Sequence, residues 1–456
     1  MPGFLKVYGY EAPETAIGWN ISTTRQQLIS SLMTLGAFIS SSLAGFVAAK
    51  LGRKICLRLA CLLCAVANII MMTTTDIGPL YLGRLLIGLA NGYFMTFSQL
   101  YIQESSPARY RGLFLTAFHL CTTFGTLIGT IIDWSTAKRP DRSAYLIPLG
   151  IIYVVPVFIF IAILFIPESP RWLILQGRYD DGLKSLKWLR PDGADVDQEM
   201  ADIRQAIDNE RDLASSVGIW DMVNNPIDRR RTMVSVCAVL LQAASGSMFI
   251  IAYKAYFFAM AKVQDPFAMT NVLSMAGMIA IIINAFIVVR YGRRRVLLFS
   301  GLIISGCFQL IIAVVYDKNP GEIITGKGMI APYSWMVAGE IPSQRLRSYT
   351  FGVAAAAGFL GAWLITFTAP YFINPSALNW GPRYGYIWFP SCIVCAVWVY
   401  FFLPKVKGRT LEEIDAMFNE ELPARKFRAY RVPPPVAEGA AEKSSIEVKV
   451  LETERV

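Results

Sequence analysis

Two stretches, Glu104-Ser-Ser-Pro-Ala-Arg-Tyr-Arg111 and Glu340-Ile-Pro-Ser-Gln-Arg-Leu-Arg347, decide the fold because they repeat one pattern in the two halves of the chain. Gly52-Arg53-Lys54 is matched by Gly292-Arg293-Arg294 at nearly the same spacing. A third, looser pair of motifs has a similar offset. Three motifs that share one spacing indicate an internal duplication, with each motif at the same place in its half.

The composition excludes an ordinary soluble protein. Of the 456 residues, 54% are apolar and only 17% are charged, whereas soluble domains average about 25% charged residues. The mean hydropathy is +0.44. A formal net charge of +10 would suggest nucleic-acid binding in a soluble chain. Here the basic residues lie in short loops between apolar runs, where they orient a membrane protein. We therefore expect an all-α, multi-pass membrane protein with no nucleic-acid partner.

Apolar runs long enough to cross a bilayer, about 20 residues each, recur along the chain. Ten full runs cover 28–49, 57–75, 79–102, 113–133, 145–166, 233–253, 270–289, 296–316, 351–373 and 384–403. An eleventh run, 328–339, has only half the required length. Duplicated helical bundles of this kind, joined by a long central loop, are typical of secondary transporters.

The polar segment 167–231 separates five runs from six. Lysine and arginine are much denser in the loops on its side of the membrane than on the other, so the positive-inside rule predicts that this side is cytoplasmic. We therefore expect four parts. They are a five-span N-terminal bundle (1–166), a cytoplasmic helical linker (167–231), a six-span C-terminal bundle with one short span (232–404), and a cytoplasmic helix with a disordered tail (405–456).

The repeated motifs carry opposite charges at the predicted cytoplasmic helix ends. The basic members are Arg53, Arg111, Arg293 and Arg347, and the acidic members are Glu104, Glu168 and Glu340. Charges at the membrane edge pair when they can, because desolvation is costly there. Pairs that form in one state and break in another act as a bistable latch. The alternative is that the basic residues only anchor helix ends to lipid headgroups.

Taken together, these motifs resemble those of the sugar porter family of the major facilitator superfamily. The resemblance is carried by the G-R-K and G-R-R motifs, Arg84 in GRLLIG, ESSPARYRG, PESPRWL with Glu168 and Arg171, GEIPSQRLRS and GRTLEEID. The segments GYFMTFSQLYIQESSPARYRG and YKAYFF are similar to fungal members, including α-glucoside permeases. The resemblance covers about residues 4–418. It implies a major facilitator fold of twelve helices in two pseudo-twofold bundles, with a helical intracellular domain.

The resemblance also implies which residues contact a sugar between the bundles. The matching positions are His119, Gln242, Tyr253, Trp335 and Trp363. His119 stands where glutamine is usual, Ala243 replaces a second glutamine, and Ala362 replaces an asparagine. Such a site would offer fewer amide groups than a typical hexose site, which argues against ordinary glucose because sugars are held by many hydrogen bonds.

His119 is the only histidine of the chain, and it is either a packed core residue or a proton-responsive site residue. Lys254 either contacts the site or extends its ammonium group to the outer membrane surface. The eight cysteines lie in or beside apolar runs, where we expect them to pack as small apolar residues. We expect no catalytic residues, no metal and no cofactor, and therefore no enzyme.

The function that the resemblance implies is transport of a sugar or related polyol by alternating access, with proton symport. The expected partners are that sugar, protons and the lipid bilayer, and we expect a monomer in the plasma membrane. Two alternatives stay open, namely a non-transporting sugar sensor on the same fold and a truncated, non-functional gene product. Sugar uptake by cells that express the chain separates them.

The spans also predict two gaps in the fold. The positive-inside rule places Met1 outside with no preceding span, so we expect the first helix of the fold to be missing. Arg84, the expected coupling residue, would then lack the acidic partner that related proton symporters supply from that helix. The short run 328–339 predicts an incomplete tenth helix, because it is too short to cross the bilayer core.

Overall fold

The computed structural model describes most of the chain. The described residues are 1–13, 18–107, 111–191, 193, 195–214, 221–260, 265–291, 294–318, 347–374, 377–404, 417–418 and 420. The chain divides into two units, Met1–Leu403 and Pro404–Val456. All the helices discussed below belong to the first unit. Most of the predicted cytoplasmic helix and all of the run 328–339 lie outside the described residues.

The first part of the chain forms helices that run back and forth. Their bounds are α1 (Pro2–Tyr8), α2 (Thr23–Leu51), α3 (Arg53–Thr73), α4 (Ile77–Ser105), α5 (Arg111–Thr136), α6 (Ser143–Ile151) and α7 (Val154–Phe165). A two-stranded antiparallel hairpin, β1 (Tyr10–Glu11) with β2 (Trp19–Asn20), follows α1. Four short helices form the linker: α8 (Pro170–Leu175), α9 (Tyr179–Leu189), α10 (Val196–Ala214) and α11 (Asp221–Asn224).

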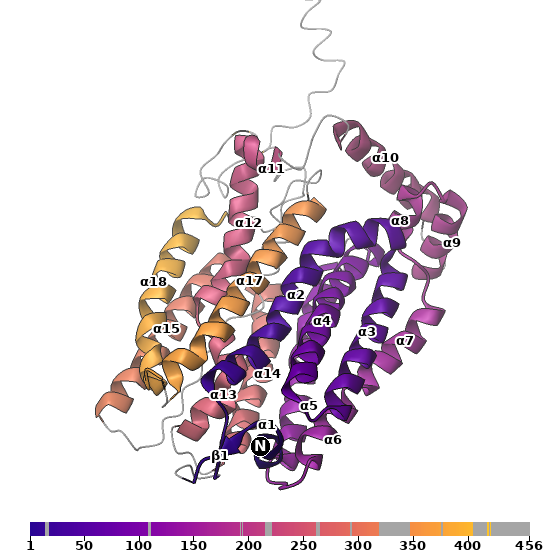
Figure 1. Ribbon diagram of the computed structural model, residues 1–456. Helices are drawn as coiled ribbons and strands as arrows, with labels where there is room; N and C mark the ends of the chain where they lie inside the picture. Colours follow the sequence, from indigo (N-terminus) through magenta and orange to yellow (C-terminus); the bar gives the residue numbers. More distant parts are fainter. Residues whose placement is uncertain are drawn as a thin grey trace, which may run out of the picture. The chain divides into compact units, whose positions relative to one another are not determined.

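The second part repeats this arrangement. Its elements are α12 (Pro226–Ala244), α13 (Ser247–Met260), α14 (Pro266–Tyr291), α15 (Arg294–Lys318), α17 (Arg347–Ile373), the 3-10 helix η1 (Gly381–Tyr384) and α18 (Gly385–Phe402). Figure 1 shows α2 and α17 side by side between the two bundles. Helix α5 packs against α14 in the same way. The bundles therefore meet along two seams, α2–α17 and α5–α14.

Two ends of the first unit are distinguished below. The inner end is where α3 begins and α4 ends, beside α8, and it is the predicted cytoplasmic end. The outer end is the opposite one, where α5 ends and α14 begins (Figure 1).

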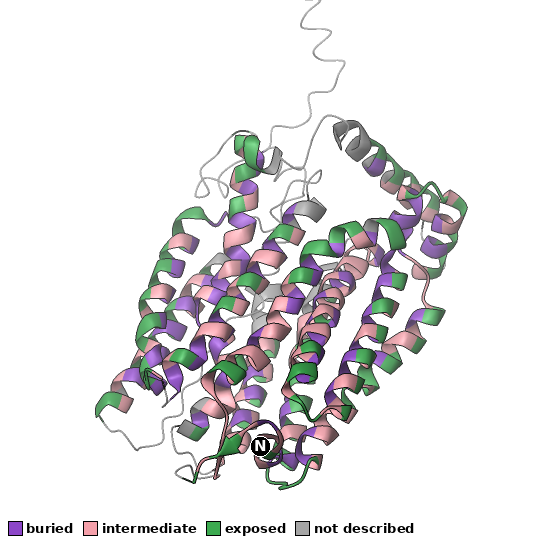
Figure 2. Ribbon diagram, in the orientation of Figure 1, coloured by how far each residue is buried: buried purple, intermediate pink, exposed green. Residues whose placement is uncertain are grey.

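The helices present apolar side chains outward. Within the described residues, nine helical segments are long and apolar enough to cross a membrane. Phe158 and Phe165 of α7 are 72% and 75% exposed, and exposed positions follow the outward faces of the helices in Figure 2. In water such faces would be an aggregation liability, but in a bilayer they meet lipid tails. The multi-pass membrane assignment therefore follows from the structure as well as from the hydropathy.

Inside the N-terminal bundle, small residues let helices approach closely, as is common in membranes. A Cβ on Gly88 of α4 would lie 2.1 Å from the carbonyl oxygen of Met33 in α2. A Cβ on Gly36 of α2 would lie 2.3 Å from the carbonyl oxygen of Leu85 in α4. No side chain larger than hydrogen fits at either position without moving a backbone, so these glycines set the distance between α2 and α4.

Two runs that the sequence presents as continuous are broken in the structure. The run 145–166 divides into α6 and α7, because Pro156 has no N–H to donate to the carbonyl one turn earlier. The run 233–253 divides into α12 and α13 at Gly246, which has a φ of +75°. Hydropathy alone does not detect such breaks because both sides of each break are apolar.

Candidate functional site

A buried ion pair lies at the inner end of the N-terminal bundle. Arg53 is the first residue of α3, and its Nη2 is 2.6 Å from Oε1 of Glu104 in the last turn of α4. Both side chains are only 9% exposed. Ser169 Oγ donates a hydrogen bond of 2.6 Å to the other carboxylate oxygen of Glu104. The pair therefore joins α3, α4 and the start of the linker. We call Arg53, Glu104, Glu168 and Ser169 the inner charge cluster.

Glu168 has a different partner from the one that its charge suggests. Its Oε1 accepts hydrogen bonds from the backbone N–H groups of Arg53 at 3.1 Å and Ser169 at 2.9 Å, and its Oε2 accepts from Lys54 N–H at 3.1 Å. It thus stabilises the N-terminus of α3, where free N–H groups and the helix dipole favour a carboxylate. Gly52 makes room for this contact, since a Cβ there would lie 2.7 Å from Glu168 Oε2.

The remaining members of the expected latch are less fully defined. Arg171 is partly buried at the start of α8. Arg111 and Arg347 are the first residues of α5 and α17. Arg293 and Glu340 lie outside the described residues, as does Trp335. A latch between the two bundles at the inner end therefore stays a prediction.

At the outer end, hydrogen bonds join the two bundles along the α2–α17 seam. Asn374, directly after α17, donates from Nδ2 to Thr23 Oγ1 at 3.1 Å and to Gln26 Oε1 at 3.0 Å, both on α2. Its Oδ1 accepts a 2.7 Å hydrogen bond from Tyr256 of α13. Further along the seam, the hydroxyl oxygens of Thr34 and Thr366 are 3.1 Å apart. All these groups are neutral.

The α5–α14 seam has a contact of its own at the outer end. Trp134 Nε1 donates to Asp265 Oδ2 at 3.2 Å, and Lys138 Nζ lies 3.4 Å from the same oxygen. Asp265 Oδ1 accepts from the N–H of Ala268 in the first turn of α14. This backbone hydrogen bond, with smaller contributions from Trp134 and Lys138, lowers the pKa of Asp265 below its ordinary value of 3.8. Asp265 therefore stays ionised at neutral pH.

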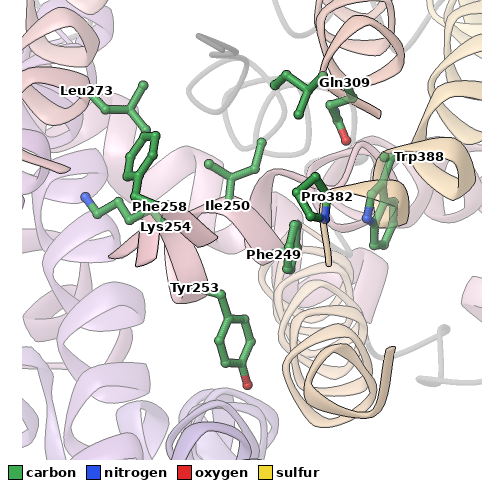
Figure 3. A pocket seen from close by; sticks show the side chains of 11 residues that line it. Phe249, Ile250, Tyr253, Lys254, Phe258, Leu273, Gln309, Pro382 and Trp388 are labelled. Atoms are coloured by element: carbon green, nitrogen blue, oxygen red, sulfur yellow. The ribbon is translucent and has the colours of Figure 1, made fainter. Parts of the chain in front are cut away.

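Within the C-terminal bundle a small hollow of about 50 Å³ lies among α13, α14, α15, η1 and α18. Its walls are mostly apolar, with Phe249, Pro382 and Trp388 grouped on one side in Figure 3. Tyr253 and Lys254, at successive positions of α13, point in different directions there. Tyr253 donates a 2.7 Å hydrogen bond to the carbonyl oxygen of Thr366 on α17.

The break between α12 and α13 borders this hollow and exposes backbone polar groups. Gln309 of α15 is 6% exposed and donates from Nε2 to the carbonyl oxygen of Ser245 at 3.0 Å. Ser247 donates to the carbonyl oxygen of Gln242 at 2.6 Å. Trp388 Nε1 is buried and has no hydrogen-bond partner among the described residues. Unwound helices that direct polar groups into a bundle commonly form substrate sites in transporters.

The four expected sugar contacts that the structure describes are not gathered in this hollow. Tyr253 lines it, whereas Gln242 is buried beside the helix break. Trp363 stacks on Phe367 within α17, with ring centroids 5.6 Å apart. His119 lies on α5 in the other bundle, beside Phe118. A sugar site between the bundles therefore stays a prediction. Gln309 and Trp388 were not among the site residues predicted from the sequence. Gln309 could have been found, because it is a polar amide inside the apolar run 296–316.

Arg84, the expected coupling residue, lies in the outer half of α4 with its Nε buried and without a hydrogen-bond partner among the described residues. Asp133 of α5 and Tyr8 of α1 are its electrostatic neighbours. The sequence left Arg84 without an acid, and the structure brings one, Asp133, from the fourth predicted span of the bundle.

The comparison with known families decides the identification. A model of the family described as "Sugar (and other) transporter" matches residues 2–418. The chain belongs to this family. Among curated sugar porter relatives, the major facilitator-type transporter ecdD of Aspergillus rugulosus is 26% identical over 472 residues, which covers 97% of this chain and 86% of ecdD. Maltose permease MAL31 of Saccharomyces cerevisiae is 28% identical over 461 residues, covering 97% of this chain and 75% of the permease.

The fold agrees with a solved member of the major facilitator superfamily. XylE of E. coli, a proton:xylose symporter solved with bound 6-bromo-6-deoxy-D-glucose, has a TM-score of 0.69 and 17% sequence identity to this sugar porter. The similarity covers 87% of this chain and 89% of XylE. The major facilitator fold expected from the motifs is therefore confirmed, and these relatives are transporters rather than enzymes.

Proposed function

We propose that this sugar porter moves a sugar or related polyol across the plasma membrane by alternating access, coupled to protons. The observation that carries the proposal is the way in which the bundles meet at the outer end. The hydrogen bonds of the α2–α17 seam, at Asn374 and at Thr34, connect neutral side chains from both bundles. Each such hydrogen bond contributes only about 0.5–1.5 kcal/mol net. The outer end can therefore open and close in each transport cycle at a small cost in free energy.

The break between α12 and α13 supports a role for this part of the C-terminal bundle in binding the sugar. Hydroxyls, amides and carbonyls gather around Gly246, and apolar rings lie beside them. Sugars are bound by this combination of hydrogen-bonding groups and aromatic faces. Maltose permease MAL31 and the proton:xylose symporter XylE, to which the chain is similar, support the same substrate class. His119, Gln242, Trp335 and Trp363 stay predicted contacts of the transported sugar.

Uptake of radiolabelled sugars tests the proposal. The chain is expressed in a yeast strain without its own sugar transporters, and a panel of mono- and disaccharides is offered at two pH values. We expect uptake of at least one sugar, faster at the lower external pH. Absence of uptake of every sugar, despite surface expression, would overturn the proposal. The assay also separates a transporter from a sensor, since a sensor binds without flux.

A pair of glycine variants connects uptake to the helix break. Gly246 and Gly193 both have positive φ, +75° and +91°. A Cβ on Gly246 would lie 2.7 Å from the Trp388 ring, whereas a Cβ on Gly193 would meet nothing within 4 Å. We expect Gly246→Ala to reduce uptake strongly and Gly193→Ala to leave it nearly unchanged. Equal uptake by the two variants would show that the helix break at Gly246 is not part of the transport site.

A further inference from the structure

A small group of charges gathers near the outer end, where α5 meets elements of both bundles. Asp133 lies one turn before the end of α5, on a helix that packs against α4 and α14. The charges that act on its carboxylate are those of Arg84 on α4, Lys254 on α13 and the amino group of Met1 at the start of α1. No ion pair of 4.0 Å or less involves Asp133 among the described residues, so these charges act across a gap.

Lys254 belongs to the other bundle and is held in place there. Its Nζ donates a 2.7 Å hydrogen bond to Ser274 Oγ of α14, and Ser274 in turn donates to the carbonyl oxygen of Thr270. Figure 3 shows the ammonium nitrogen directed away from the apolar side of the hollow, toward helices in the purple shades of the N-terminal part. The Lys254 side chain is therefore directed toward the N-terminal bundle, and Asp133 of that bundle is the charge that acts on its ammonium group.

These positions connect the charge of Asp133 to the contact between the bundles. When Asp133 is ionised, it attracts Arg84 from its own bundle and Lys254 from the other, in a setting where charges are poorly screened. When Asp133 takes up a proton, this attraction ends and two positive side chains remain near the α5–α14 seam. Their repulsion favours separation of the seam at this end.

We propose that Asp133 is the proton-carrying carboxylate of this transporter, and that Arg84 and Lys254 convert its charge into opening of the α5–α14 seam. The inference rests on the proposed function. The proton is taken up on a carboxylate oxygen of Asp133 from the outer side and leaves from the same residue to the inner side. No other bond is made or broken. Intramembrane acids that pair with basic residues are characteristic of proton pathways.

The other titratable groups at this place do not replace Asp133. From α14 the facing acid is Asp265, whose pKa lies below 3.8, so it stays ionised between pH 5 and pH 7. From α1, Tyr8 and the Met1 amino group are near Arg84 and Asp133. From the α5–α6 loop, Arg142 lies near Tyr8. Asp133 is thus the acid of this group that lies between basic residues of both bundles.

The test compares Asp133→Asn with Asp76→Asn, a change of an exposed acid at the start of α4, also at the outer end. Each protein is purified and placed in liposomes. The probe is the sugar of the panel above that the wild type exchanges fastest. Two rates are measured, namely exchange of labelled for unlabelled sugar without a pH gradient, and accumulation driven by an imposed pH gradient.

We expect Asp133→Asn to keep exchange within about twofold of the wild type while losing gradient-driven accumulation by about tenfold or more. Asp76→Asn should keep both activities. Asp133→Glu, which retains an acid, should restore accumulation with a shifted pH profile. Retained exchange shows that the Asn variant is folded, so loss of coupling is specific.

The two proposals fail differently. If the wild type exchanges no sugar, the proposed function is wrong and the inference falls with it. If the wild type accumulates sugar and Asp133→Asn still does so to the same extent, transport stands and the role of Asp133 is wrong. If Asp133→Asn and Asp133→Glu both lose exchange as well as accumulation, Asp133 is a structural residue and the inference is again wrong.

Discussion

The inner charge cluster and the outer end of the α2–α17 seam differ in both charge and connectivity. At the inner end, Arg53 and Glu104 form a buried ion pair within one bundle and join it to the start of the linker. At the outer end, Asn374 joins the two bundles through hydrogen bonds between neutral groups. The strong contacts therefore lie inside one bundle, and the weaker ones lie between the two bundles that the proposed transport cycle would separate.

This difference has a physical reason. A buried charge without its partner is costly, so breaking a buried pair in every cycle would add a large barrier. Neutral hydrogen bonds exchange with water at little net cost. The inner charge cluster, as the structure has it, is thus a structural element of the N-terminal bundle. A latch between the two bundles at the inner end, in which Arg53 and Glu104 act with Arg111, Arg293, Glu340 and Arg347, stays a prediction.

The largest effect is expected for the buried ion pair. Glu104→Ala removes the partner of Arg53 and leaves that charge buried, which should lower the free energy of unfolding by about 3–5 kcal/mol. The control is Asp181→Ala, which breaks the Arg178–Asp181 pair at side chains that are 57% and 44% exposed. That change should stay within about 1 kcal/mol. Thermal unfolding in detergent compares the two, and equal losses would contradict the structural role.

The next effect concerns the turn that brings Glu168 to α3. Gly52 and Gly177 both have positive φ, +82° and +77°. A Cβ at Gly52 meets Glu168 Oε2 at 2.7 Å, whereas one at Gly177 meets nothing within 4 Å. Gly177→Ala should therefore lose about 1 kcal/mol for backbone strain alone. Gly52→Ala should lose about 1–3 kcal/mol more, because it also disturbs the cap of α3. Thermal unfolding in detergent measures both variants. Equal melting temperatures for Gly52→Ala and Gly177→Ala would contradict the role of Gly52 in bringing Glu168 to α3.

These residues also mark what could be predicted from the sequence. The opposite charges of the repeated motifs indicated that Arg53 and Glu104 belong to one cluster. The same reasoning placed Glu168 among these charges, and the structure shows that its carboxylate accepts hydrogen bonds from backbone N–H groups. A charge pattern indicates which residues attract each other. The path of the backbone at Gly52 decides which donors lie within hydrogen-bond distance of the Glu168 carboxylate, and the sequence pattern does not contain that path.

The membrane spans were likewise predictable from hydropathy, and the breaks inside them were not. The apolar runs all fall on helices wherever the structure describes them, because a helix satisfies the backbone polar groups of a single segment within that segment, as lipid requires. The break at Gly246 depends on Trp388 and Gln309, which come from two other helices. Asp133 was overlooked for a similar reason, since its neighbours Arg84 and Lys254 are brought near only by the packing of α4, α5 and α13.

A smaller effect is expected at the α2–α17 seam. Asn374→Ala removes the side-chain hydrogen bonds to Thr23, Gln26 and Tyr256 and should shift the balance toward outer opening by about 1 kcal/mol, roughly fivefold in population. Thr368→Ala is the control, since its hydroxyl bonds carbonyl oxygens within α17 and the side chain of Tyr384 in the same bundle, with no partner from the N-terminal bundle among the described residues. The rate at which a cysteine introduced at Ser30 of α2 reacts with a water-soluble reagent reports opening. The native cysteines are replaced beforehand. An unchanged rate for Asn374→Ala would mean that the seam is closed by other contacts.

The smallest effect is expected for Lys138, the exposed partner of Asp265. Its side chain is 84% exposed, and its distance of 3.4 Å to Asp265 is that of a surface pair, which contributes about 0–1 kcal/mol. Lys138→Ala should therefore change neither uptake nor the labelling rate measurably at physiological salt. Trp134→Phe removes the neighbouring N–H donor to Asp265 while keeping an aromatic ring, and its effect should be larger than that of Lys138→Ala.

The pH dependence separates this contact from Asp133. Since hydrogen bonding lowers the pKa of Asp265 below 3.8, its contribution is fully present above that value and is lost only as the pH falls through the lowered pKa. A pH response of opening between 5 and 7 that disappears in Asp265→Asn but persists in Asp133→Asn would reverse the assignment of the proton to Asp133.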